Sequence, residues 1–429
     1  MSNNSTREII AGIVAFCAVV PAFYAADSII RQITTTQISF LTAMLFIGGT
    51  STVVASWLIR SPLIFSPNIS LVSLMVFTMY LGGGLPYTHV LSVLLLTGFI
   101  VFLFGITGAG NALLKCVPLS LYPGFVAGAG LLLFSTGLRE AGIVTAHPVT
   151  IMTVGDFTTR GPVITIVAVL IFVITWSRGL KIPLLWAGLA AVLMGTILGV
   201  VPSIDVSLLT IPQIQSYPIL ESTRLFLLCN TRFMPSITLI IIIETLTIYL
   251  AIMAFTDRTD TLREKSQQRI WLVTGTAGVI SPFAGVPGPL LSVEGFIAKL
   301  AGGKSGLAGI ITGMLLLLCP LIPIPAQLIG AGYHIGNNLW LHPITASLLI
   351  SGGLLSMVAL GKVDWENVEI AVPTAVIVVL TPLAFSIVTG VGSGIVIYTI
   401  IRLAKGEVSP VRPLLVFLIP LVLLRYILL

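Results

Sequence analysis

Two glutamates stand in stretches of the chain that are otherwise apolar. Glu244 follows four consecutive isoleucines in the middle of a long apolar run, and Glu294 opens a short apolar segment that comes after Gly288 and Pro289. A carboxylate at membrane depth costs at least about 2.5 kcal/mol on insertion scales, so it normally faces a cavity and acts on ions, protons or substrate. We therefore expect both glutamates to bind a small solute, and Glu244 to carry a coupling proton. The alternative is a permanently protonated glutamate that is hydrogen-bonded inside a helix bundle.

Further polar groups are expected to face the same point from a second short segment, residues 68–80, which follows a Ser66-Pro67 break. A helix that starts there would direct its first amides at the membrane centre, and helix N-termini favour negative or acceptor groups. Capping of this helix by Asn68 is the structural alternative. The candidate substrate-binding residues are Glu244, Glu294, Val293, Ser292, Asn68, Ser70 and Phe23.

The composition requires lipid as the solvent for most of the chain. Of 429 residues, 56% are hydrophobic and 8% are charged, whereas soluble domains carry roughly 25% charged residues. The mean hydropathy is +1.11. Because backbone polar groups must be satisfied internally in lipid, the spanning elements are expected to be helices. The sequence thus predicts an all-α polytopic membrane protein.

About fourteen segments can be recognised from apolar runs near the length that spans a bilayer. The runs of that length are 9–30, 36–59, 87–108, 118–137, 161–177, 182–201, 236–255, 268–282, 306–325, 340–361, 369–386 and 388–404. The segments 68–80 and 289–301 are too short to span, and each follows a Pro or Gly break. A last run, 412–429, is a C-terminal hydrophobic or interfacial helix whose insertion the sequence leaves open.

Basic residues indicate the orientation. If the N-terminus is cytoplasmic and the runs alternate, most Lys and Arg residues, including those between 258 and 269, fall in cytoplasmic loops, as the positive-inside rule expects. We therefore predict a multi-pass protein of the cell (inner) membrane with a cytoplasmic N-terminus. The polar start of the chain shows no small-residue cleavage pattern of a signal peptide.

An internal repeat organises the segments. Residues 118–134, which contain Gly130, resemble residues 343–357, which contain Gly353, at an offset of about 223 residues. The same offset superimposes the two short segments. With seven segments in each half the halves must be inverted, as in many secondary transporters, and paired broken segments point to a midplane binding site. We predict a first repeat at 1–205, an extracytoplasmic connection at 206–235 and a second repeat at 236–411.

Several other functions find no support in the sequence. The four cysteines lie in apolar segments without paired or metal-ligand spacing, and no two of the four histidines share a helix face at metal-ligand spacing. A nucleotide-binding Gly-Lys-Ser/Thr loop and a nucleophile elbow are absent. We expect no enzyme activity, no cofactor, no metal and, because the basic residues are scattered, no nucleic-acid partner despite the net charge of +6.

The chain resembles a known family over nearly its whole length, in motifs that agree in order and spacing. Residues 141–148 continuing to 155–157, together with 371–373, 382–387 and Gly390, are similar to the AzgA-like adenine/guanine/hypoxanthine permeases of the nucleobase-ascorbate transporter superfamily. The resemblance implies a UraA-like fold of two inverted seven-segment repeats with a core domain and a gate domain. It also implies proton-coupled uptake of a purine, substrate contacts at Glu244 and Glu294, and a homodimer in membrane lipid.

A second resemblance is to the SulP sulfate permeases, which share this fold. It is carried by Val20-Pro21, residues 66–74, 124–128 and 283–288, and the later Gly302-Gly303-Lys304. It implies a transporter of sulfate, bicarbonate or a carboxylate anion as the alternative function. Glu294 counts against this reading, because a buried carboxylate repels an oxyanion. A non-transporting membrane scaffold or receptor is a third possibility that no residue favours.

Overall fold

The computed structural model describes residues 2–33, 40–116, 118–147, 151–180, 182–201, 264–292, 294–321, 328–335, 339–407 and 419–420. The predicted segment 236–255 with Glu244, the predicted connection 206–235 and nearly all of the run 412–429 therefore lie outside the described residues, as does Val293. The proposed repeat boundaries at 205 and 236 remain predictions for the same reason.

The first half of the chain is a series of apolar helices with one break. Its helices are α1 (Ser2–Ile30), α2 (Phe40–Ile59), α3 (Ile69–Ser73) with a π-helical continuation (Leu74–Gly82), α4 (Tyr87–Thr107), α5 (Ala109–Cys116), α6 (Tyr122–Glu140), α7 (Arg160–Ser177) and α8 (Pro183–Ile197). The break before α3 holds strand β1 (Phe65–Ser66). Proline and glycine set the ends: Pro183 opens α8, and Gly108 ends α4 in the left-handed conformation at φ 73°.

The described part of the second half repeats this pattern. It contains α11 (Glu264–Ile280), β4 (Leu290–Leu291), α12 (Glu294–Leu300), α13 (Gly306–Leu318), α15 (Pro343–Ser356) with a 3-10 continuation (Met357–Lys362), α16 (Val368–Leu383) and α17 (Ile387–Ala404). In the described residues, seven helical stretches are long and apolar enough to cross a membrane, and four shorter apolar helices accompany them. The fold class predicted from the sequence is confirmed, and the protein is a multi-pass membrane protein.

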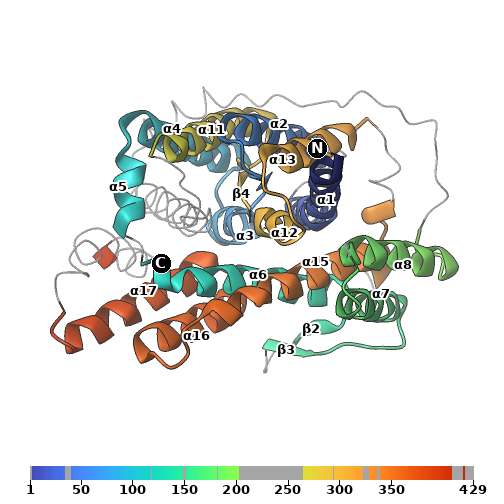
Figure 1. The fold of residues 1–429 in the computed structure, drawn as a ribbon. Coiled ribbons are helices and arrows are strands. Elements are labelled where there is room, and N and C mark those ends of the chain that lie inside the picture. The colour runs from blue at the N-terminus through green and yellow to red at the C-terminus, as the bar shows by residue number, and fades with distance from the viewer. Residues whose placement is uncertain are drawn as a thin grey trace.

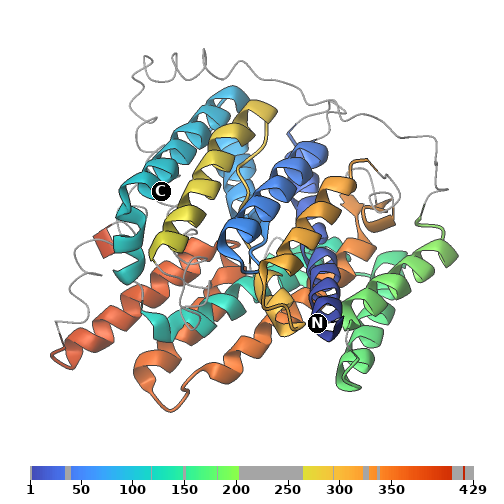
Figure 2. The same ribbon diagram turned by 45° about the horizontal axis from the view of Figure 1, so that its top comes forward.

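The helices form two layers (Figure 1). The core layer consists of α1, α2, α3, α4, α11, α12 and α13, which pack mainly against one another, and the gate layer consists of α6, α7, α8, α15, α16 and α17. Figure 2 shows α4, α11, α2 and α13 side by side across the core layer. The layers meet where α1 and α12 contact α15 and where α1 contacts α8. The two layers match the core and gate domains that the family resemblance implied.

Helix pairs within each layer follow the predicted repeat. In the core layer α4 packs on α11 and α2 packs on α13, which are the pairs that an exchange of the two halves would interconvert. In the gate layer α6 packs on α15, and these helices carry the two similar sequence stretches. A Cβ added at Gly353 would lie 2.5 Å from the Gly130 carbonyl oxygen. The repeat-related glycines thus touch, as expected of elements beside a pseudo-two-fold axis.

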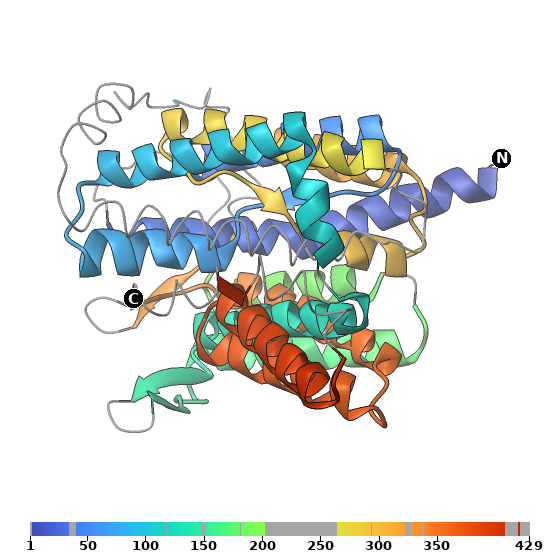
Figure 3. The same ribbon diagram turned by 90° about the vertical axis from the view of Figure 1, so that its left-hand side faces the viewer.

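Three two-stranded ladders were not predicted. Strand β1 pairs with β4, β2 (Val144–His147) pairs with β3 (Ile151–Val154), and β5 (Tyr333–Ile335) pairs with β6 (Leu339–Leu341), all antiparallel. Figure 3 shows the β2–β3 and β5–β6 hairpins at one end of the molecule and the N-terminus at the other. Strands this short have too few residues for a period-two pattern, so the sequence carried little signal for them.

Candidate functional site

The two broken segments meet in the interior through their strands. Phe65 pairs with Leu291 and Ser66 with Leu290, and the Ser292 amide donates a hydrogen bond to the Ile64 carbonyl at 2.8 Å. This ladder brings the start of α3 and the approach to α12 together from opposite halves of the chain. The juxtaposition that the repeat predicted is therefore present in the structure.

Helix α2 fixes the first break through its hydroxyl side chains. Thr52 Oγ1 accepts a hydrogen bond from the Phe65 amide at 2.9 Å, and Ser56 Oγ donates to the Leu63 carbonyl at 2.9 Å. Both side chains are fully buried. Because an extended chain inside a bundle exposes backbone groups that lipid cannot satisfy, these hydroxyls serve as the partners that the break needs. The Tyr87 hydroxyl donates to the Gly285 carbonyl and supports the second break.

A small cleft with an internal volume of about 40 Å³ lies at this meeting point, between the two layers. Small-molecule sites are mostly apolar with a few polar groups, and the lining of this cleft has the same character. The lining residues come from α1, the two breaks, α6 and α17, and they are Ala22, Ser66, Pro67, Asn68, Ile69, Ala129, Leu132, Leu133, Leu291, Ser292 and Ile387. No basic residue is among these described lining residues, so the visible walls suit a neutral, partly apolar ligand.

Two of the predicted site residues line the cleft. Asn68 caps α3, and its Oδ1 accepts a hydrogen bond from the Leu71 amide at 3.1 Å. The capping role that the sequence offered as the alternative for Asn68 is therefore confirmed, and the cap uses only the Oδ1 atom. Ser292 lies on the opposite wall, and its buried Oγ has no hydrogen-bond partner within the described structure.

The other predicted residues are placed differently. Ser70 is 2% exposed and its Oγ also lacks a partner, but it is not among the cleft-lining residues. Phe23 is fully buried in a hydrophobic cluster against Gly48, and the α1 residue that lines the cleft is its neighbour Ala22. Glu294 is the first residue of α12, two residues after Ser292.

Sequence reasoning missed the contribution of the gate layer to the cleft. Ala129, Leu132 and Leu133 of α6 and Ile387 at the start of α17 complete the wall facing the breaks. The available signal was the small-residue stretch Ala127 to Gly130, which was read as part of the repeat and not as a cleft wall. Across the described residues, no cluster of His, Cys, Asp and Glu could hold a metal ion.

Known proteins with similar sequences are nucleobase permeases and transporters. No family model matches the chain. It is 27% identical over 415 residues to the guanine/hypoxanthine permease PbuG of Bacillus subtilis, covering 91% of this chain and 87% of the relative. It is 22% identical over 440 residues to the adenine permease AdeP of Escherichia coli, covering 98% and 93%. The nucleobase transporter PlAzg2 of Paenibacillus larvae is 24% identical, with 92% and 77% covered.

Solved structures share the fold. The transmembrane domain of the cyanobacterium bicarbonate transporter BicA superimposes with a TM-score of 0.53 at 18% identity, covering 91% of this chain and 97% of that domain. Murine Slc26a9, an anion transporter in the inward-facing state, gives a TM-score of 0.54 at 11% identity, covering 93% and 68%. These proteins are permeases and transporters, not enzymes, as predicted. The chain is therefore similar in sequence to bacterial nucleobase permeases, and it has the fold of the SulP and SLC26 transporters, so both resemblances found in the sequence are confirmed.

Proposed function

We propose that the protein is a proton-coupled secondary transporter that imports a purine or related nucleobase. The observation that carries the proposal is the cleft between the two breaks, which lies at the boundary of the two layers in a chain similar to guanine/hypoxanthine and adenine permeases. A site at such a boundary can face either side of the membrane as the layers move.

The cleft suits the chemistry of a purine. Its walls combine aliphatic side chains with the Ser292 hydroxyl and the Asn68 amino group, and a planar base presents apolar faces and a hydrogen-bonding edge. An ionised carboxylate can only accept hydrogen bonds, so Glu294 at the start of α12 would accept them from N–H donors of the base. These contacts orient the base between the two breaks.

Glu244 supplies the coupling in this mechanism. We assign to it a proton taken up from outside, which is released inside together with the base after the core layer has moved against the gate layer. The motivation is a carboxylate that directly follows four isoleucines in a predicted span. The other parts of the proposal are the inward direction, a cytoplasmic N-terminus in the cell membrane and a homodimer.

Uptake into proteoliposomes tests the proposal. Purified protein would be assayed with radiolabelled hypoxanthine, adenine, uracil and sulfate, with and without an inward proton gradient. Gradient-driven purine uptake that unlabelled purine competes away is the expected result. Glu244→Gln should lose the gradient dependence, and transport at the parent rate with unchanged pH dependence would exclude Glu244 as the coupling residue.

The same assay decides the competing function. The fold likeness to BicA and Slc26a9 keeps an inorganic or carboxylate anion as the second candidate. Sulfate or bicarbonate uptake without a purine signal would establish that candidate and remove Glu294 as a substrate ligand.

A further inference from the structure

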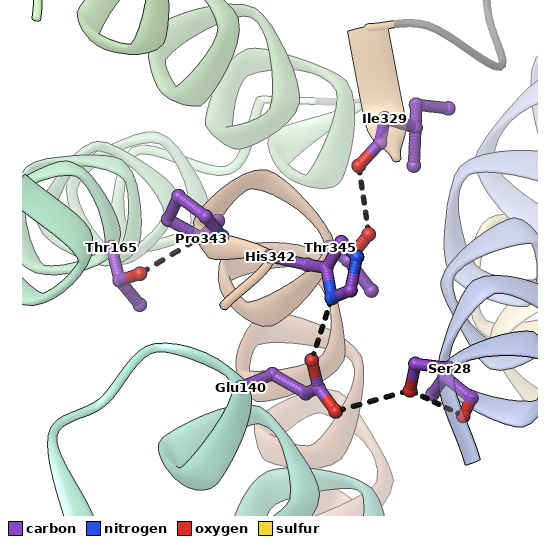
Figure 4. Close-up of polar contacts among 8 residues, drawn as sticks. Ser28, Glu140, Thr165, Ile329, His342, Pro343 and Thr345 are labelled. Carbon is purple, nitrogen blue, oxygen red and sulfur yellow. Dashed lines mark hydrogen bonds and ion pairs between the residues drawn. The ribbon is translucent and has the colours of Figure 1, made fainter. Parts of the chain in front are cut away.

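A polar cluster joins the two layers at a distance from the cleft. Glu140 ends α6 and His342 precedes α15, both in the gate layer, whereas Ser28 lies in the last turns of α1 in the core layer. His342 Nδ1 is 2.9 Å from Glu140 Oε2, and Ser28 Oγ donates to Glu140 Oε1 at 3.4 Å. Figure 4 shows Glu140 between His342 and Ser28. One carboxylate thus contacts both layers.

The start of α15 is held firmly on its gate-layer side. The His342 amide donates to the Glu140 carbonyl at 3.1 Å, and Thr165 of α7 donates to the Pro343 carbonyl at 3.2 Å. Thr345 donates to the Ile329 carbonyl at 2.7 Å (Figure 4). Since His342 is only 8% exposed, its ring has little freedom to leave the seam between the layers.

A second carboxylate interacts with His342 from the core layer. Asp27 of α1 is 5% exposed, and its carboxylate interacts with Arg31, with the Leu41 backbone amide and, more weakly, with His342. Its Oδ2 is 2.6 Å from Arg31 Nε, one turn further along α1. With His342 neutral and both carboxyls ionised, the side chains of Glu140, Asp27, Arg31 and His342 together carry two negative charges and one positive charge. Protonation of His342 makes the net charge of these four side chains zero.

The other described charged groups on elements packed against α15 do not neutralise the net negative charge that this cluster has while His342 is neutral. Arg139 stacks over the Phe385 ring at 5.2 Å from its centroid, and Arg160 at the start of α7 is exposed. Tyr24 of α1 is neutral at ordinary pH, and α8 contains no titratable residue. α12, with Glu294 and Lys299, meets α15 at Gly352, about 15 Å along the helix from His342 at 1.5 Å per residue. Lys362 ends the 3-10 continuation beyond that point.

We propose that His342, Glu140 and Asp27 form a proton-binding site across the seam, in which a proton on His342 holds this end of the two layers together. The imidazolium attracts Glu140 within its own layer and Asp27 in the opposite layer. Loss of the proton leaves the two carboxylates on opposite sides of the seam, offset by the Ser28 hydroxyl, Arg31 and the Leu41 backbone amide, and their mutual repulsion favours separation. Histidine is the side chain whose charge ordinarily changes between about pH 5 and 8.

Spin-label distances test this site without any substrate. Labels would be placed at Gln32→Cys beyond α1 and at Thr158→Cys before α7, both exposed positions on opposite layers, in a background without the four native cysteines. Double electron–electron resonance in lipid nanodiscs would be recorded at pH 5.5, 7 and 8.5. We expect the longer-distance population to rise at least threefold between pH 5.5 and 8.5.

Matched variants identify the group responsible. His342→Gln should abolish the pH response, and His342→Lys, which keeps a positive charge, should hold the short distance at every pH. His334→Gln on β5, an exposed histidine on the neighbouring hairpin, should respond like the parent. An unchanged distance distribution in the parent across this pH range overturns the proposal, as does a parent-like response in His342→Gln. Because no solute is added, either result is independent of whether purines are transported.

Discussion

Two buried serines without partners offer a test of which hydroxyl binds solute. Ser292 lines the cleft whereas Ser70, equally short of hydrogen bonds in the described structure, does not. A buried hydroxyl without a partner costs free energy that a ligand can recover. Because both residues are serines, the same substitution at the two positions distinguishes a ligand-binding role from a packing role.

We expect Ser292→Ala to raise the KM for purine uptake about 3- to 10-fold, the effect of losing one hydrogen bond of roughly 1 kcal/mol. The melting temperature should stay the same or rise, because the change removes an unsatisfied group. Ser70→Ala is the matched control and should leave the KM unchanged. Equal KM effects for both variants would mean that cleft lining does not identify the ligand hydroxyl.

Asn68 allows capping to be distinguished from ligand binding. Asn68→Ser retains an oxygen that can accept from the Leu71 amide but removes the Nδ2 amino group. The expected result is a nearly unchanged melting temperature with weaker purine uptake. Asn68→Ala should lower both, with a stability loss of about 0.5–2 kcal/mol. A parent-like KM in Asn68→Ser would restrict Asn68 to its capping role.

At the scale of elements, close helix crossings depend on glycine. A Cβ added at Gly98 of α4 would lie 2.4 Å from the Gly278 carbonyl carbon of α11, and one at Gly275 would lie 2.4 Å from backbone atoms of Phe102. In lipid, such small-residue contacts replace the hydrophobic effect as a source of helix association. The core layer therefore depends on them for its packing.

Gly98→Ala should lower the free energy of unfolding by about 1–3 kcal/mol, because backbone atoms cannot move aside for the new methyl group. Gly361→Ala is the control, since nothing lies within 4 Å of its added Cβ. The readout is the thermal unfolding temperature in detergent. If the two variants melt at the same temperature, the close approach of α4 and α11 does not limit stability.

Glu8 attaches the N-terminal helix α1 to the start of α13 within the core layer. Its carboxylate accepts backbone hydrogen bonds from Lys304 at 2.8 Å, Ser305 at 3.0 Å and Ala308 at 3.3 Å, at the start of α13. Glu8→Ala should cost about 0.5–2 kcal/mol, as the loss of a helix cap does, whereas Glu366→Ala at an exposed position should be neutral. Thermal unfolding of the two variants measures the difference.

At the scale of the whole molecule, the proposed transport mechanism requires the two layers to move against each other. Ile297 of α12 in the core layer lies beside Gly352 of α15 in the gate layer, with 3.8 Å between the Ile297 side chain and a Cβ added at Gly352. Gly188 of α8 and Leu348 of α15 are an equally close pair within the gate layer. The first pair crosses the boundary between the two layers and the second does not.

Thiol cross-linking should separate these two cases. In a background without native cysteines, a short cross-link between Ile297→Cys and Gly352→Cys should stop uptake, and reduction should restore it. The Gly188→Cys and Leu348→Cys pair should retain most of its uptake when cross-linked. Undiminished transport with the layers joined would exclude a mechanism based on relative motion of the layers.

The sequence by itself determined that lipid surrounds most of the chain and that the spanning elements are helices. It also indicated where two segments are broken and that the two halves of the chain are similar. These features are properties of composition and of local pattern: long apolar runs must be helices in lipid, and Pro and Gly mark where helices end. It also singled out Asn68 and Ser292 from their positions beside the breaks.

The tertiary structure decided which groups meet. The sequence did not indicate that β1 pairs with β4, that α6 and α17 complete the cleft wall, or that Ala22 and not Phe23 faces the cleft. It also gave no sign that Glu140, His342 and Ser28, distant along the chain, lie together at the seam. When a helix is apolar on all sides, hydrophobic periodicity does not mark the face that points into the protein. The neighbours of each side chain are therefore set by close packing between helices, which only the folded structure contains.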